Sequence, residues 1–110
     1  MSVSSVNTER KKVNKLQILR NAKNELAKEG FYILGIVGSF ARGENYNDID
    51  IIYETDKNFE NKYLGWDYFI KIEEIKKTLE KLLQSKIDLI NSSSMNQIAK
   101  KYMMKDFVNV

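Results

Sequence analysis

A polar stretch, GSFARGENYNDID at residues 38–50, lies between two apolar segments and limits how they can be arranged. Residues 31–37 and the segment from Asp48 to Tyr53 are short and rich in β-branched and aromatic residues, which predicts two buried strands. Parallel strands need a connection of a dozen or more residues, but Asp48 follows Gly38 by only ten. We therefore expect antiparallel strands, with the Gly38-Ser39 turn beside the start of the second strand.

Two longer helices are predicted from apolar residues that recur three or four positions apart. The first covers residues 8–29, with Gly30 at its C-terminal end, and the second covers residues 68–84. Residues 1–6 are small and polar, and we expect them to be frayed and disordered. The predicted core-facing positions of the two helices are Val13, Leu16, Leu19, Ala22 and Leu26, and then Tyr68, Ile72, Ile75, Leu79 and Leu82.

Shorter elements complete a predicted order of α-β-α-β-α-β-α. Ser39 can cap a short helix that runs to about Glu44, and residues 87–90 form a third strand. Ser94 to Gln97 fits a capping box that opens a last helix ending near residue 104. Residues 54–66 show no clear period, and residues 106–110 can add an edge strand. The predicted fold class is α/β, with one small mixed sheet flanked by helices.

Three aspartates are expected at one end of this sheet. Side chains alternate between faces along a strand, so Asp48 and Asp50 point the same way while Ile49 and Ile51 face the core. The long helical connection to the third strand allows a parallel crossover, which brings Asp88 to the same end. The sequence therefore predicts three carboxylates beside the Gly38-Ser39 turn.

Composition restricts the chemistry that this site can perform. The chain has 110 residues, the size of one domain, and it contains neither cysteine nor histidine. Disulfides, thiolate or imidazole metal sites and histidine catalysis are thereby excluded. No segment resembles a signal sequence or reaches the length of a membrane span, so we expect a cytoplasmic protein. A net charge of +3 does not by itself indicate nucleic acid, and the N-terminal lysines are interpreted as a solvated helix face.

Clustered carboxylates with only oxygen ligands favour a hard cation such as Mg²⁺. A Gly-Ser turn that leads into a helix offers backbone N–H groups to phosphate oxygens. These features suit metal-assisted transfer from a nucleoside triphosphate, with two ions about 3.5–4 Å apart. Asp48 and Asp50 would hold the ions, while Asp88 would help to hold one at the attacking hydroxyl and accept its proton. Arg42 could neutralise charge on the leaving pyrophosphate.

Each assignment has a plainer structural alternative. Arg42 can equally form a structural ion pair with Glu44 or with a carboxylate of the site. An Asp-Ile-Asp sequence most often marks only the exposed face of an edge strand. The aromatic residues Tyr63, Trp66 and Tyr68 are expected to pack over the core, with adenine stacking as the alternative for one of them.

The combined pattern resembles the minimal nucleotidyltransferases of the DNA polymerase β superfamily. It consists of Gly38-Ser39, Ala41-Arg42-Gly43, Asp48-Ile49-Asp50 and Ile87-Asp88-Leu89, and it covers most of the chain. The resemblance implies a mixed sheet flanked by helices and Mg²⁺-dependent transfer of AMP from ATP to a hydroxyl. It further implies an antitoxin that acts beside a helical HEPN-domain ribonuclease toxin, in some members by adenylylating a tyrosine of that toxin.

Three other functions remain open at this stage. Eight residues separate Ser39 from Asp48, fewer than in many minimal members, which favours a non-catalytic antitoxin that occludes its toxin. The chain could instead be the nucleotide-binding subunit of a two-chain transferase that acts on a small molecule. The third and most remote of these functions is RNA binding by the basic first helix. The chain could form either homo- or hetero-oligomers.

Overall fold

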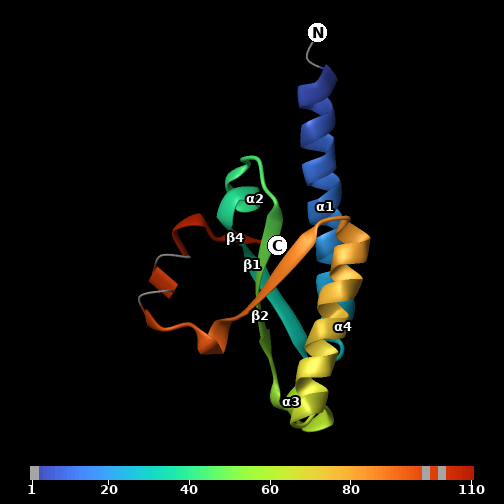
Figure 1. Cartoon of the computed structure of the whole chain (residues 1–110), viewed down its shortest axis with the longest axis vertical. Helices are drawn as coiled ribbons and strands as arrows, with labels where there is room; N and C mark the ends of the chain where they lie inside the picture. Colours follow the sequence, from blue (N-terminus) through green and yellow to red (C-terminus); the bar gives the residue numbers. More distant parts are fainter. Residues whose placement is uncertain (1–2, 98–99, 102–103) are drawn as a thin grey trace.

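The computed structural model describes residues 3–97, 100–101 and 104–110, and it places helices and strands in alternation (Figure 1). The elements are α1 (Val3–Ala27), β1 (Phe31–Val37), α2 (Gly38–Arg42), β2 (Asp48–Thr55), α3 (Lys57–Lys62), α4 (Trp66–Leu83), β3 (Lys86–Asn91), the 3₁₀ helices Ser92–Ser94 and Met104–Asp106, and β4 (Val108–Asn109).

The four strands form one mixed sheet in the order β3-β2-β1-β4. β1 and β2 are antiparallel, as the short connection between them predicts. β2 and β3 are parallel, and α4 provides the long crossover that this arrangement requires. β4 pairs antiparallel with β1, which confirms the predicted edge strand. The predicted α/β fold class, with a mixed sheet and flanking helices, is confirmed.

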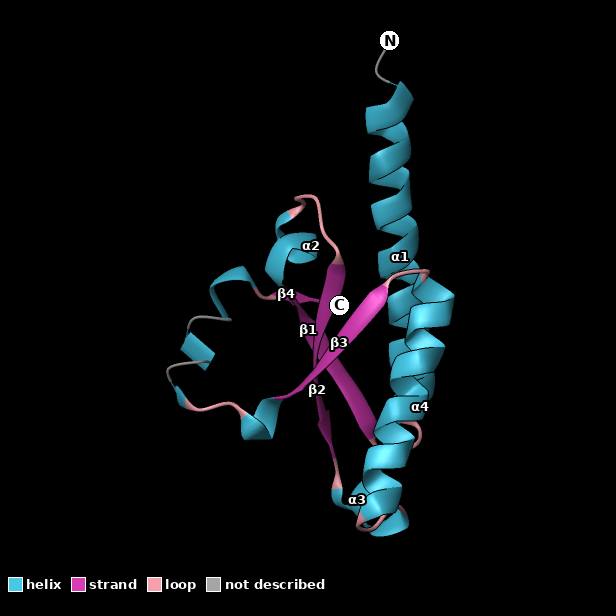
Figure 2. Cartoon of the chain, viewed as in Figure 1, coloured by secondary structure: helices cyan, strands magenta, loops and turns pink. Residues whose placement is uncertain are grey.

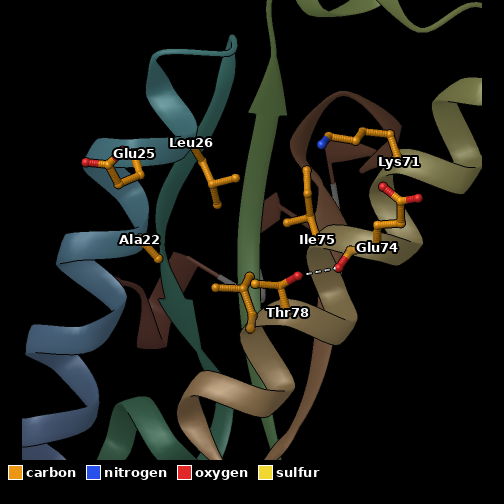
Figure 3. Close-up of a pocket in the computed structure, with 8 residues that line it drawn as sticks. Ala22, Glu25, Leu26, Lys71, Glu74, Ile75 and Thr78 are labelled. Atoms are coloured by element: carbon orange, nitrogen blue, oxygen red, sulfur yellow. Dashed lines mark hydrogen bonds between the residues drawn. The ribbon is translucent and has the colours of Figure 1, made fainter.

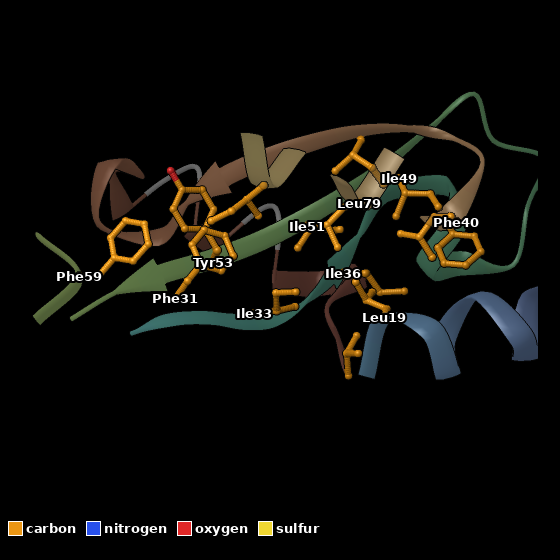
Figure 4. Close-up of a cluster of buried hydrophobic side chains, with 14 residues drawn as sticks. Leu19, Phe31, Ile33, Ile36, Phe40, Ile49, Ile51, Tyr53, Phe59 and Leu79 are labelled. Carbon is orange, nitrogen blue, oxygen red and sulfur yellow. The ribbon is translucent and has the colours of Figure 1, made fainter. Parts of the chain in front are cut away.

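The core lies between one face of the sheet and the two long helices, α1 and α4 (Figures 1 and 4). The strands contribute the side chains that alternate toward the helices, and the helices contribute Leu19, Ile75, Leu79 and Leu83. Leu16, Ala22 and Leu26 pack against this cluster, as the helical period of α1 predicts. The described residues between β3 and β4 (92–97, 100–101 and 104–107) lie on the other side of the sheet, away from α1 and α4 (Figure 2). Val110, after β4, returns to the core and accepts a hydrogen bond from Nζ of Lys23 in α1.

The ends of the long helices differ from the prediction. α1 starts at Val3, so Val3 to Val6 are helical where a frayed segment was expected. The physical reason is that α1 contains no glycine or proline that would stop a helix. At the end of α4, Leu83 is buried and Leu82 is 50% exposed, so the predicted core position Leu82 was wrong by one residue. α4 ends at Leu83, and Gln84, with φ of 51° in the left-handed region, turns the chain toward β3. Leu83 packs in the core at this junction.

The segment 54–66, predicted as an irregular connection, contains the two-turn helix α3. Phe59 is its one buried residue, and its ring lies 6.0 Å from Phe31 and 5.6 Å from Tyr68, measured between centroids. Six residues are too few to show a helical period, so the sequence pattern does not reveal this helix.

The C-terminal segment is also more broken than predicted. Ser92–Ser94 form a 3₁₀ helix, and the amide of Lys100 donates to the Asn96 carbonyl oxygen at 2.9 Å. Residues 98–99 and 102–103 of the predicted last helix lie outside the described residues.

Asp56 caps α3, and its carboxylate gives the fold a pH dependence. It accepts the Phe59 amide at 3.0 Å and the Tyr32 hydroxyl at 2.8 Å. Both hydrogen bonds lower the pKa of Asp56 below its ordinary value of 3.8, and the bond from the Phe59 amide has the larger effect. A lowered folded-state pKa means that the charged carboxylate stabilises the fold above pH 3.8, and this contribution is lost as the pH falls through the folded value.

We expect Asp56→Asn to lower Tm by several degrees at pH 7, because the amide is a weaker acceptor than the carboxylate. The difference in Tm between the two proteins should shrink as the pH falls below about 4 and vanish in strong acid. Thermal unfolding followed by circular dichroism between pH 2.5 and 7 measures this. A Tm difference that stays constant over the whole range would contradict the assigned role.

Candidate functional site

The face of the sheet opposite α1 and α4 carries the predicted aspartates. Ile49, Ile51 and Ile87 are buried against the helices, and the aspartates beside them point the other way. Asp48 and Asp88 are exposed and Asp50 is half-buried. Asp50 and Asp88 are direct partners in the register of β2 and β3. The three aspartates therefore share one face of the sheet, as predicted. Their convergence on one metal site is not seen among the described residues, and their roles stay predictions.

Gly38 lies against this row of carboxylates. Val37, the last residue of β1, pairs with Asp50, so the chain leaves the strand next to that side chain. Gly38 has φ of 83°, the left-handed region that favours glycine. A Cβ atom added to Gly38 would lie 2.5 Å from Oδ2 of Asp50. Only glycine therefore lets the backbone turn this close to the carboxylate.

The predicted cap of the short helix was wrong. α2 begins at Gly38, its N-cap residue is Val37, and no side chain caps it. The positive φ of Gly38 turns the chain straight from strand to helix, so the helix starts one residue before Ser39. Ser39 is half-buried within the first turn of α2, next to Gly38.

The electrostatics of the site favour a cation. Burial and then the negative charges of Asp88 and Asp48 raise the pKa of Asp50 above its ordinary value. Among the described residues, no group of three or more acidic side chains is arranged so that it could hold a metal ion. Mg²⁺ commonly takes only one or two carboxylates together with substrate phosphate oxygens. The all-oxygen donor set of Asp48 and Asp50 fits that ion chemically.

Arg42 is engaged by two carboxylates. Its Nε donates to Oε1 of Glu44 at 2.7 Å, and its Nη1 donates to Oδ2 of Asp106 at 2.9 Å. These hydrogen bonds, with Glu44 the stronger influence, raise the pKa of the guanidinium. The structural alternative for Arg42, a pair with Glu44, is thus formed, and Asp106 joins it. Sequence reasoning missed Asp106 because it is 64 positions away, and no local pattern marks it.

The loop between α2 and β2 is held from α1. Nζ of Lys15 donates to the Tyr46 hydroxyl at 2.5 Å and to Oγ of Ser85 at 2.8 Å. The ring of Tyr46 meets that of Phe40 edge-on, with centroids 4.8 Å apart. The interpretation of the N-terminal lysines as a solvated face was wrong for Lys15, because folding brings a hydroxyl from each of two turns within its reach. This contact fixes the short loop that leads into Asp48.

The aromatic residues near α4 lie away from the aspartates. Tyr63 and Tyr68 pack against the core, as expected, but Trp66 is 80% exposed, so its predicted packing was wrong. Trp66 opens α4, where the chain turns at Gly65 before the core-facing stripe begins. α3 and the start of α4 lie near the opposite end of strands β1 and β2 from α2 (Figure 1). Trp66 is therefore not placed to stack on a nucleotide held beside Gly38.

A pocket lies on the side of the sheet that is covered by α1 and α4. It has a volume of about 280 Å³ between α1 and α4, with Ala22, Leu26 and Ile75 among its lining residues (Figure 3). Because the sheet separates it from the aspartates, it does not belong to this site.

We expect Gly38→Ala to destabilise the chain by about 1–3 kcal/mol, because it adds both a strained backbone and a contact with Asp50. Urea denaturation measures the loss. Gly65→Ala is the matched control, since Gly65 also has positive φ (58°) but a Cβ there meets no atom within 4 Å. If both variants lost the same stability, the close approach of Gly38 to Asp50 would have no energetic weight.

No helix among the described residues combines the length and apolarity needed to cross a bilayer.

Comparison with known proteins places this chain in a family. Residues 17–109 match the nucleotidyltransferase domain. A protein of Methanocaldococcus jannaschii is 35% identical over 99 residues, which cover 86% of this chain and 92% of that relative. A second protein of the same organism is 40% identical over 83 residues, which cover 72% of this chain and 86% of that relative. Each carries the name "putative protein adenylyltransferase".

The fold has a counterpart among solved structures. A structure described as a "putative minimal nucleotidyltransferase" superposes with a TM-score of 0.66 at 17% identity, covering 94% of this chain and 95% of that one. At this identity the likeness establishes the fold alone. Together with the match over residues 17–109, it shows that the chain belongs to the nucleotidyltransferase domain family and has the fold of a minimal nucleotidyltransferase.

Proposed function

We propose that this chain is a cytoplasmic protein adenylyltransferase that transfers AMP from ATP to a hydroxyl group of a partner protein. The observation that carries the proposal is the row of Asp48, Asp50 and Asp88 on one sheet face, with Gly38 in contact range of Asp50. The names of the two relatives support a protein as the acceptor. The resemblance to minimal nucleotidyltransferases supports a HEPN-type toxin as that partner, with this chain as its antitoxin.

The proposed reaction forms one bond and breaks one. The acceptor oxygen attacks the α-phosphorus of ATP, the bond to the β-phosphate oxygen breaks, and pyrophosphate leaves. Asp88 would accept the proton of the attacking hydroxyl. Asp48 and Asp50 would hold two Mg²⁺ ions, which supply charge neutralisation at the phosphates. The backbone at Gly38 and Ser39 would contact the phosphate oxygens.

The direct test is a mass measurement on the partner. The chain is incubated with Mg-ATP and a candidate HEPN-type partner protein, and intact masses are recorded. We expect the partner to gain one or more AMP groups and to lose ribonuclease activity. A partner that is inhibited without any gain in mass would rule out the transferase function.

That last outcome corresponds to a second candidate function, a non-catalytic antitoxin that occludes its toxin. Two observations favour it. The loop between Ser39 and Asp48 has eight residues, and Arg42 is paired with Glu44 and Asp106 and so is not oriented toward a ligand. In this case the toxin would be inhibited in a stoichiometric complex, with or without ATP.

Arg42→Ala separates a catalytic role from a structural one. If Arg42 exchanges its carboxylate partners for phosphate, the substitution should lower kcat for AMP transfer by about 10- to 100-fold. Its side chain is 42% exposed, and exposed ion pairs contribute little to stability, so Tm should change by no more than a few degrees. Arg20→Ala, an exposed arginine of α1, is the control for loss of a positive charge. A large fall in Tm with unchanged turnover would assign Arg42 to the fold.

A further inference from the structure

A second pocket lies on the same sheet face as the aspartates. It has a volume of about 300 Å³ and lies between the sheet and the segment that follows β3. Its apolar lining consists of Leu34, Ile52, Met95 and Phe107. Its polar lining consists of Glu54, Ser92 and Lys100. The pocket thus combines apolar walls with one carboxylate, one hydroxyl and one ammonium group.

The pocket is adjacent to the proposed phosphate site. Asp50, Ile52 and Glu54 alternate with core residues along β2, so all three point to the same face. Two residues of a strand span about 7 Å, which places Ile52 next to Asp50 along the strand. A ligand whose phosphate lies at Asp50 can therefore reach the pocket through a connecting group the size of a ribose.

The wall formed by Phe107 is held in place by two contacts. A Cβ atom added to Gly35 would lie 2.4 Å from Cζ of Phe107, so the ring packs directly on the β1 backbone. The neighbouring Asp106 is bonded to Arg42 of α2, at 2.9 Å. The segment that covers the pocket is thus tied both to β1 and to the helix that follows the Gly38 turn.

The lining matches the chemistry of a nucleobase. An aromatic ring and a thioether beside aliphatic side chains suit a flat heteroaromatic ligand. Adenine carries an exocyclic amino donor beside ring-nitrogen acceptors. The Glu54 carboxylate can accept from that amino group, and Ser92 can donate to a ring nitrogen. We propose that this pocket binds the adenine base of the nucleotide, an assignment that rests on the proposed nucleotide substrate.

Adenosine is the probe that tests this assignment, because it lacks the phosphates that the aspartate site would bind. Binding of adenosine to the full chain is followed by chemical-shift changes of ¹⁵N-labelled amides in nuclear magnetic resonance titrations. We expect adenosine to shift the amides of Leu34, Ile52 and Phe107, and to bind more tightly than guanosine, cytidine or uridine. Asp50→Asn should leave the Kd for adenosine unchanged.

Substitutions in the pocket give the sharper test. Phe107→Leu should weaken adenosine binding at least about threefold through lost stacking, and it keeps an apolar side chain against Gly35. Glu54→Ala should weaken it about fivefold, and Glu54→Gln should recover most of that loss because the amide oxygen still accepts. Glu73→Gln, an exposed position of α4 on the other side of the sheet, is the matched control and should have no effect.

The possible failures are distinct from failure of the proposed function. If ATP binds with Mg²⁺ but adenosine does not bind, or if the pocket variants bind adenosine normally, the base lies elsewhere and the assignment is overturned. Equal binding of the four nucleosides would also overturn the assignment. Displacement of adenosine by tyrosinamide would overturn it as well, because it would mark the pocket as the binding site of the acceptor hydroxyl. Adenosine binding as expected without AMP transfer to any partner would support the pocket and refute the transferase.

Discussion

Asp50→Asn is expected to abolish AMP transfer while leaving the chain as stable as, or more stable than, the unsubstituted protein. Loss of the central carboxylate should lower kcat by at least about 10³-fold, since in the proposed reaction this charge would hold the ions at the reacting phosphate. Stability should respond in the opposite direction. Burial, Asp88 and Asp48 all disfavour the charged form of Asp50 and raise its pKa. A neutral amide of the same shape relieves this repulsion at every pH above the folded pKa.

The measurement pairs partner adenylylation with thermal unfolding in Mg²⁺-free buffer at pH 7. Asp48→Asn should also abolish transfer. Asp67→Asn is the matched control, because Asp67 is an exposed aspartate in the first turn of α4. It should retain full activity. If Asp50→Asn lost activity only because its Tm fell far enough to unfold the protein at the assay temperature, Asp50 would support the fold and not the reaction.

Phe59→Ala is expected to be the most destabilising single substitution among those considered. The side chain is fully buried, and its ring contacts the rings of Phe31, Tyr63 and Tyr68, with the Tyr63 centroid at 4.9 Å. Truncating a buried phenylalanine costs about 3–5 kcal/mol, because the transfer free energy is lost and a cavity remains. Domains of this size have total stabilities of about 5–15 kcal/mol, so this variant should lose much of its folded population at 37 °C.

Urea denaturation at 25 °C gives the free energy of unfolding for this comparison. Phe69→Ala makes the same chemical change in the first turn of α4, at a side chain that is 65% exposed. It should cost less than about 1 kcal/mol. Similar losses for the two variants would mean that α3 is not anchored to the core through Phe59.

The arrangement of the central strands could be predicted from the sequence because it depends on chain length and on the strand period. Asp48 follows Gly38 by only ten positions, which is too short for a parallel crossover, whatever the surrounding packing. The helix before Asp88 is long enough for one. The period of two residues then puts Asp48 and Asp50 on one face and Ile49 on the other. These constraints are local or geometric, so they survive folding unchanged.

Other features could not be predicted because they depend on which segments meet. α3 is too short to show a period, and only its contact with Phe31 and Tyr68 identifies Phe59 as a core residue. The burial of Leu83 in place of Leu82 reflects the direction in which α4 enters the turn before β3. In both cases the tertiary contact overrides a weak local preference.

The sequence by itself determined the antiparallel pairing of the two central strands and the shared face of the three aspartates. Only the tertiary structure decided what surrounds them: that Lys15 holds the loop at Tyr46, and that Asp106 reaches Arg42. These partners are 31 and 64 positions apart, and a hydrogen bond between such residues leaves no period or spacing in the sequence. Backbone geometry acts between neighbours in the chain, whereas the shape of the site is set by neighbours in space.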